Sequence, residues 1–168
     1  MVEWLRDYDS QEHPAELTSR DYVFAMLALL CLLPSANTRH KAKLSSAELV
    51  NNFVWFKSAQ TSIDLFLAEK KSSHKQPFLL CLGTPDRPGL FYLIVDVKAI
   101  SLGDCGVLKA VDALFKAHFV FWVSYAKSSE LLIEFLQKLI YKIDNKKLSP
   151  RVRELHNSVM SFRARNSE

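Results

Sequence analysis

Residues 78–95 read FLLCLGTPDRPGLFYLIV, two apolar runs on either side of a turn rich in glycine and proline. Two runs of this length around such a turn are typical of a β-hairpin. Strands with only one buried face alternate apolar and polar residues, whereas strands buried on both faces are apolar throughout. Both runs here are apolar throughout. The hairpin therefore predicts a sheet that helices cover on both sides.

The apolar run Phe119 to Val123 predicts a third strand, preceded by a helix that Asp104 would cap. A helix between two strands is the usual connection of a parallel pair. The predicted fold class is α/β, with a small mixed three-stranded sheet. Its strands are expected at 78–82, 90–97 and 118–124. The helices of 18–69 should cover one face, and at least one of the helices 104–117 and 128–144 the other. The alternative is that part of a strand face meets a partner protein.

The N-terminal half, residues 18–69, is expected to be entirely helical. Its first helix contains a run of twelve apolar residues, 22–33, which at about 18 Å is too short to cross a hydrocarbon core of about 30 Å. This helix should begin at Thr18 or Ser19, end at Pro34 and lie at the centre of its layer. Ser45 followed by Glu48 predicts a capping box at the start of a second helix that continues through Phe56.

The composition of this chain, 168 residues with 49% hydrophobic and 24% charged, is that of one globular domain. Its expected parts are an acidic N-terminal segment 1–17, the helical half 18–69, an α/β half 77–144 and a basic helix 149–164. Residues 138–168 hold eight lysines and arginines against three acidic residues, and the formal charge of +4 comes from this segment. Basic surfaces of this kind contact nucleic acid, acidic proteins or only water.

Three cysteines, an odd number, suit a reducing compartment better than a disulfide framework. About twenty mostly polar, acidic-leaning residues precede the apolar run 22–33, unlike the basic start of a secretion signal. We therefore expect an intracellular protein of the cytoplasm or nucleus, without a membrane partner. The sequence leaves the oligomeric state open.

Pro85-Asp86 followed by Asp96-Val97-Lys98 resembles the signature of restriction-endonuclease-like nucleases, in which acids bind a metal and a lysine orients water. In a hairpin that turns near Asp86, however, Asp96 lies opposite Gln76. The two carboxylates would then be some 25–30 Å apart, too far for one metal ion. A degenerate site of Asp96 and Lys98, together with His74, remains as an alternative.

Other chemical signals are weaker. Residues 103–106 resemble the Gly-x-x-Gly loop of KH domains, but Asp104 has the wrong charge for phosphate contacts. Cys105 and His118 are an alternative catalytic pair. The five histidines stand singly, and the chain has only four glycines with which to build a phosphate loop. We expect no cofactor and no metal, and the balance of these observations disfavours an enzyme.

The best candidate contact surface is basic and lies near the C-terminus. Lys138 and Lys142 are spaced to share a helix face, and the following loop and helix add more cations. This surface would take either an acidic protein face or nucleic-acid phosphates. The predicted contact residues are Lys138, Lys142, Lys146, Lys147, Arg151 and Arg153.

Five short segments, 76–83, 95–100, 108–112, 119–121 and 134–137, carry a resemblance to a known group. Over roughly residues 20–145 the chain is similar to the C-terminal region of vertebrate, especially fish, proteins called sterile alpha motif domain-containing protein 3-like. The shared positions are apolar and turn residues, so the resemblance implies a fold and no activity. We therefore expect a non-enzymatic protein-interaction module. A nucleic-acid-associated protein is the second hypothesis and the degenerate nuclease the third.

Overall fold

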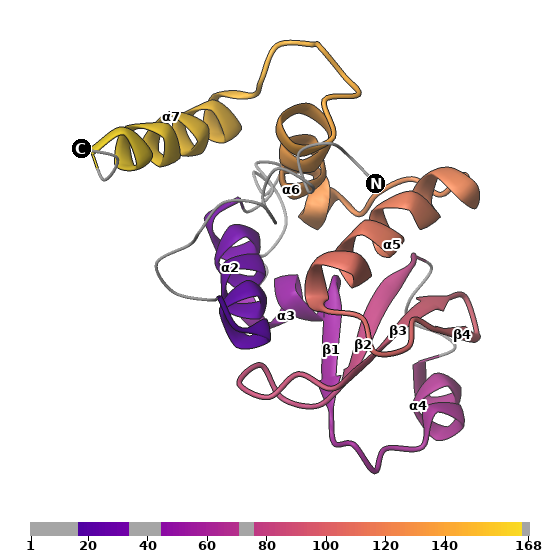
Figure 1. Ribbon diagram of the computed structural model, residues 1–168. Helices are drawn as coiled ribbons and strands as arrows, with labels where there is room; N and C mark the ends of the chain where they lie inside the picture. Colours follow the sequence, from indigo (N-terminus) through magenta and orange to yellow (C-terminus); the bar gives the residue numbers. More distant parts are fainter. Residues whose placement is uncertain (1–16, 34–44, 71–75, 166–168) are drawn as a thin grey trace.

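The computed structural model describes residues 17–33, 45–70 and 76–165. Its centre is one four-stranded sheet in the order β1-β2-β3-β4 (Figure 1). The strands are β1 (Val54–Lys57), β2 (Phe78–Leu82), β3 (Leu90–Val95) and β4 (Lys98–Ser101). β1 and β2 are parallel and the other two pairs are antiparallel, so the prediction of a mixed sheet in an α/β fold is confirmed.

The described helices precede, interrupt and follow the sheet. They are α2 (Ser19–Leu32), α3 (Ser46–Asn51), α4 (Ile63–Lys70), α5 (Val107–Val120), α6 (Glu130–Phe135) and α7 (Pro150–Arg165). A 3₁₀ turn, η1 (Lys127–Ser129), leads into α6, and a π-helical turn, η2 (Leu136–Ile140), extends it. The predicted acidic segment 1–17 apart from Leu17, the stop at Pro34 and the candidate ligand His74 lie outside the described residues.

Local side-chain chemistry sets the start of two helices. The Thr18 hydroxyl accepts the backbone N–H of Asp21, whose carboxylate accepts the Thr18 N–H at 2.8 Å. Ser45 and Glu48 form the same reciprocal pair at the start of α3. Both predicted helix starts are therefore confirmed, because a capping box depends only on residues three apart.

The β2–β3 hairpin and its register are also confirmed. Phe78 lies opposite Ile94 and Leu82 opposite Leu90, which leaves Asp86 in the connecting turn. The turn needs Gly83, because a Cβ there would lie 2.6 Å from the Arg87 carbonyl oxygen.

The predicted third strand, 118–124, is wrong. Helix α5 continues to Val120, and the chain then turns, with Trp122 at a φ of 52°. A five-residue apolar run cannot be told from a helix end by periodicity alone. Asp104 does not cap the helix, which begins at Val107 with Gly106 as a cap that makes no side-chain bond.

The all-helical N-terminal half is wrong as well. Helix α3 ends at Asn51, and β1 follows it and pairs with β2 from Val54 opposite Leu79 onward. The β-branched and aromatic residues of β1 suit a strand. The parallel pair is thus β1 and β2, connected through α4, rather than a pair formed by residues 119–123. The short strand β4, after the tight turn at Asp96, was also not predicted.

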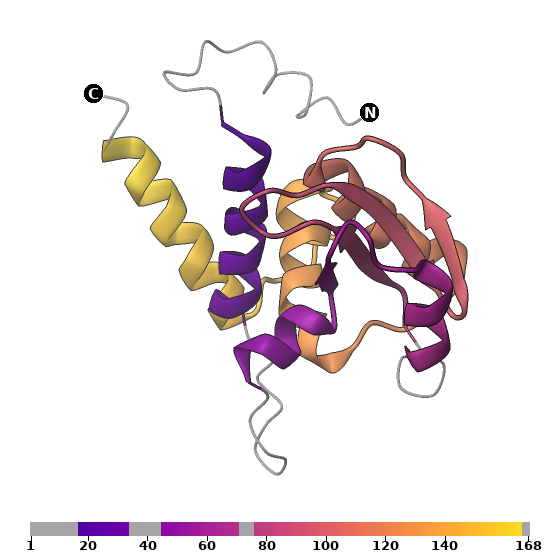
Figure 2. The same cartoon turned by 90° about the horizontal axis from the view of Figure 1, so that it is seen from below.

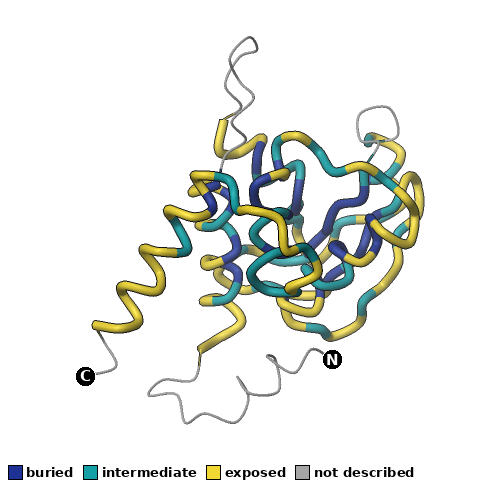
Figure 3. The backbone as a smooth tube through the Cα atoms, turned by 90° about the horizontal axis from the view of Figure 1, so that it is seen from above, coloured by how far each residue is buried: buried dark blue, intermediate teal, exposed yellow. Residues whose placement is uncertain are grey.

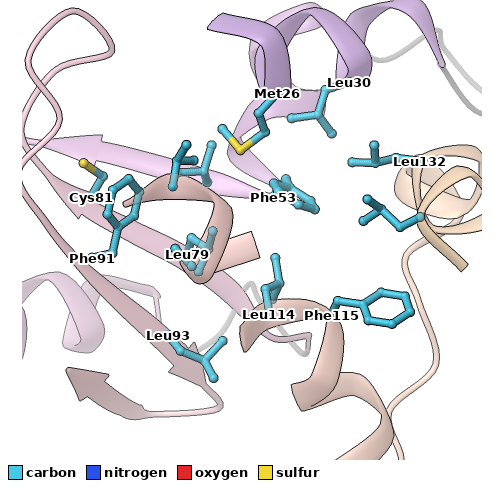
Figure 4. Packing of buried hydrophobic residues seen from close by; sticks show 14 of the residues in the cluster. Met26, Leu30, Phe53, Leu79, Cys81, Phe91, Leu93, Leu114, Phe115 and Leu132 are labelled. Carbon is cyan, nitrogen blue, oxygen red and sulfur yellow. The ribbon is translucent and has the colours of Figure 1, made fainter. Parts of the chain in front are cut away.

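Helices cover both faces of the sheet, but in a different division from the predicted one. Leu79 and Cys81 of β2 point to the main core, where they meet Met26 of α2 and Leu114 of α5 (Figure 4). Their neighbours in β2 point to the opposite face, where Phe66 of α4 packs on them. The helices of 18–69 are therefore split, with α2 and α4 on opposite faces.

Helix α7 projects from the body of the protein (Figures 1 and 2). Val152 is fully buried against Leu33 and Leu131, and Leu155 packs on the same cluster. The turns after Leu155 are exposed, as the yellow end of the tube in Figure 3 shows. One end of α7 is thus anchored and the other extends into solvent.

Candidate interaction surface

Lys138 makes structural contacts and is largely buried. Its ammonium group donates to a carboxylate oxygen of Glu134 and to the Lys147 carbonyl, both at 2.9 Å, and its side chain is only 12% exposed. Lys138 therefore holds the α6–α7 connection against η2.

Glu134 connects the same region to the start of α7. Its carboxylate accepts the backbone N–H of Ser149 at 2.8 Å in addition to the Lys138 ammonium. Burial by itself raises the pKa of Glu134, but the hydrogen bonds from Ser149 and Lys138 outweigh it and hold this pKa below the ordinary value. The ionised carboxylate thus ties the residue before α7 to α6.

Arg151 and Arg153 also make structural contacts. The Arg151 guanidinium donates to the Leu32 carbonyl at the end of α2, at 3.4 Å, and pairs with Glu154. Arg153 donates to the Leu148 carbonyl at 3.0 Å. Both arginines remain exposed, so they fix the base of α7 and still present positive charge.

The three other predicted contact residues, Lys142, Lys146 and Lys147, lie exposed on the loop before α7. In the described part of the chain, none of the three ammonium groups forms an ion pair with a carboxylate. The loop folds back on α6 through the Lys147 carbonyl and the Ser149 N–H, which brings its lysines beside the base of α7.

One side of α7 is apolar along its whole length. Val152, Leu155, Val159 and Phe162 follow one another at the three- and four-residue spacing of a single helix face. The first two are packed in the protein, whereas Val159 is 51% and Phe162 65% exposed. The stripe was visible in the sequence, and the structure shows where it leaves the core.

Helix α2 presents a second exposed apolar face. Val23, Met26 and Leu30 are buried against the sheet, but Phe24 and Leu32 on the opposite side are 42% and 48% exposed. The intervening residues of that side, Ala25, Ala28 and Cys31, are exposed as well. The prediction that α2 lies at the centre of its layer is therefore wrong. Figures 2 and 3 show α7 on the side of α2 that faces away from the sheet.

We call these two neighbouring faces the α2–α7 surface. Its apolar members are Phe24, Ala25, Ala28 and Leu32 of α2 and Val159 and Phe162 of α7. The Arg151 bond to the Leu32 carbonyl and the Leu33–Val152 contact join the two helices at one end.

A smaller apolar patch lies at the end of α5. Val120 is 75% and Trp122 94% exposed, beside a shallow pocket of about 210 Å³ that His118 and Tyr125 also line. The His118 Nδ1–H donates a hydrogen bond of 2.9 Å to the Leu114 carbonyl, and burial lowers the pKa of His118, which favours the neutral ring. The sequence did not reveal this patch, because the run containing it reads equally well as a buried strand.

The nuclease residues are not brought together. Asp86 lies in the hairpin turn, paired with Arg20 at 3.2 Å, whereas Asp96 and Lys98 lie in and after the β3–β4 turn at the other end of the hairpin. Cys105 and His118 are also separated, by the length of α5, which at 1.5 Å per residue is roughly 16 Å or more. Burial raises the pKa of the Cys105 thiol, which disfavours a reactive thiolate. Among the residues that the structure describes, no three His, Cys, Asp or Glu side chains cluster as metal ligands would.

The protein thus has a mixed α/β fold of one four-stranded sheet with helices on both faces. Comparison with protein-family models, curated proteins and solved structures found no match. In the three described ranges, no helix has both the length and the apolar character needed to cross a bilayer.

Proposed function

We propose that the protein is a non-enzymatic protein-interaction module of the cell interior and that the α2–α7 surface is its binding site. The observation that carries the proposal is the projection of α7, which exposes the second half of its apolar stripe next to the exposed face of α2. The resemblance to sterile alpha motif domain-containing protein 3-like proteins implies no enzymatic activity, so it is compatible with this function.

The energetics favour a partner at this place. An isolated helix of sixteen residues is only marginally stable in water, and the described core contacts of α7, those of Val152 and Leu155, lie in its first two turns. Complete burial of a side chain such as Val159 or Phe162 contributes roughly 1.5–3 kcal/mol relative to exposure. A partner that covers the stripe would therefore gain binding energy and stabilise the outer turns of α7.

Site-specific photo-crosslinking in cells that express the full chain tests this function. A photoreactive residue at Val159 is compared with one at Leu65, which is 69% exposed on α4, across the sheet. We expect protein adducts from position 159 that resist nuclease digestion and are absent from position 65. Equal adducts from both positions, or none from position 159, would overturn the proposal.

A nucleic-acid-associated function is the second candidate, because Lys142, Lys146 and Lys147 are exposed without a carboxylate partner in the described ranges. Contacts to three phosphates would give a plot of log affinity against log salt with a slope of roughly −2 to −3. Replacing the three lysines with alanine should abolish that slope if this candidate is right. Adducts at position 159 that nuclease removes would also favour it over the protein partner.

A further inference from the structure

We infer that the partner segment at the α2–α7 surface is an acidic amphipathic helix. This inference rests on the proposed function and adds the chemistry and shape of the partner. It draws on the charge around the surface, the spacing of its apolar residues and the direction in which the α7 stripe faces.

The charge around the stripe is strongly positive. Helix α7 contains four arginines against the single acidic residue Glu154. Arg151 directly precedes the first stripe residue and Arg163 directly follows the last, so the two flank the stripe on opposite sides. The only acidic residue of α2, Asp21, is bound to Thr18 in the capping box. Carboxylates on a partner would therefore meet cations at this surface.

The same charge argues against a second copy of this chain as the occupant. Pairing two α7 helices along their apolar stripes would bring the flanking arginines of both copies together. Like charges beside a helix–helix seam oppose association and are a common means of selecting a different partner. The complementary occupant carries glutamate or aspartate at the positions that flank its own apolar face.

The spacing of the apolar residues favours a helix. Phe24, Ala28 and Leu32 follow at intervals of four along α2, and Leu155, Val159 and Phe162 follow at intervals of four and three along α7. Rows with these intervals are the ridges that a third helix packs against. From Phe24 to Leu32 the row is about 12 Å long at 1.5 Å per residue, so three turns of a partner helix would cover it.

The direction of the stripe favours a helix over a lipid surface. Val159 and Phe162 continue the face on which Val152 packs against Leu33 and Leu131, so they look back toward the body of the protein. A flat bilayer cannot reach that inward side of α7 and the outer face of α2 together. A helix about 10 Å in diameter can lie along both.

Three synthetic peptides of equal length test the inference. The first has leucine at every third and fourth position with glutamate at the flanking positions, and the second has lysine in place of glutamate. The third is the glutamate peptide with a central proline, which breaks the helix. Binding to the full chain is measured by fluorescence anisotropy at 0.05 and 0.15 M salt, beside vesicles that contain an anionic lipid.

We expect the glutamate peptide to bind at least tenfold more tightly than the lysine peptide, and more weakly at higher salt. Proline should reduce its affinity at least tenfold. Val159→Glu in the protein should also reduce the affinity for the glutamate peptide at least tenfold. The matched control Leu65→Glu should leave this affinity within twofold of that of the unmodified protein. Circular dichroism of both variants checks that these exposed substitutions preserve the fold. Arg163→Glu should reduce the ratio between the affinities of the glutamate peptide and the lysine peptide.

Equal binding of the glutamate and lysine peptides, binding of vesicles alone, or unchanged binding by Val159→Glu would overturn the inference. Failure of the inference is distinguishable from failure of the proposed function. If Val159 crosslinks to a protein in cells but the glutamate peptide does not bind, the partner has another chemistry and the function stands. If neither occurs, the function itself is refuted.

Discussion

Glu134→Ala should weaken the docking of α7 on the body of the protein. The Glu134 carboxylate accepts two hydrogen bonds, from the Ser149 N–H at 2.8 Å and from the Lys138 ammonium at 2.9 Å, and its side chain is only 16% exposed. No other described contact links the residue before α7 to α6 through a charge. The substitution therefore acts on the anchored end of the helix that carries the proposed binding site.

The size of the effect follows from these two bonds. A hydrogen bond to a charged group contributes about 1.5–3 kcal/mol, but Lys138 keeps its bond to the Lys147 carbonyl after the substitution. We therefore expect docking of α7 to lose about 2–3 kcal/mol in total. At about 1.4 kcal/mol per factor of ten, the undocked population should rise about 30- to 150-fold.

Amide hydrogen exchange measures this change directly. Exchange of the α7 amides should accelerate by that factor, since the helix is marginal once it is undocked, while the β2 and β3 amides keep their protection. Glu154→Ala is the matched control, because Glu154 forms an exposed pair with Arg151 at 3.4 Å and should change exchange less than threefold. Similar exchange in the two variants would refute the anchoring role of Glu134.

The same contact predicts a dependence on pH. The pKa of Glu134 in the folded protein lies below its ordinary value of 4.5, so the folded state binds fewer protons there than the unfolded chain. The stabilisation is complete above the ordinary value and is lost as the pH falls through the lower folded value. Exchange of the α7 amides, corrected for the intrinsic rate, should therefore increase below about pH 4.5 in the unmodified protein and much less in Glu134→Gln.

Three further outcomes follow from other parts of the fold. Trp122→Gly should raise the free energy of unfolding by up to about 1 kcal/mol in urea denaturation, because Trp122 is exposed at positive φ, and a clear loss would contradict this reasoning. Burial lowers the pKa of His118, so stability should fall as the pH drops below about 6.5, and His118→Phe should lack this dependence. Leu80→Ala should lower the free energy of unfolding by about 2–5 kcal/mol in urea denaturation, because Leu80 is fully buried. The control Leu108→Ala, at a 47% exposed position, should lower it by less than about 0.5 kcal/mol.

The parts of the fold that the sequence predicted correctly depend on short-range chemistry. The β2–β3 register follows from a turn of seven residues, and the starts of α2 and α3 follow from capping residues three apart. β1 depends instead on its parallel partner β2, more than twenty residues further along the chain. Its four residues follow a strong helix start, so the local pattern favoured continuing the helix. The end of α5 was predicted as a strand for a related reason, because a short apolar run fits a helix and a strand equally well.

In the candidate site, too, the sequence predicts some features and misses others. The sequence displays the charge of residues 138–153 and the apolar stripe of α7, because both are patterns along the chain. It does not show that Lys138 lies in a nearly buried ion pair with Glu134, or that Arg151 donates to the end of α2. The Arg151 contact joins elements far apart in sequence. Glu134 and Lys138 are only four residues apart, but the burial of their pair depends on how the loop before α7 folds back on them through Lys147 and Ser149.

The position of α2 is a second reason, beside the projection of α7, to connect this fold with binding. A helix that is apolar on every side is normally buried on every side, yet only the side of α2 toward the sheet is covered. Among the described elements, α4 packs on the far side of the sheet, and the core contacts of α7 come from Val152 and Leu155 near its start. If the exposed face of α2 had no partner, Phe24→Ser and Leu32→Ser would leave the binding of the glutamate peptide unchanged. A loss of binding without a loss of stability would show that the hydrophobic character of this face serves association rather than folding.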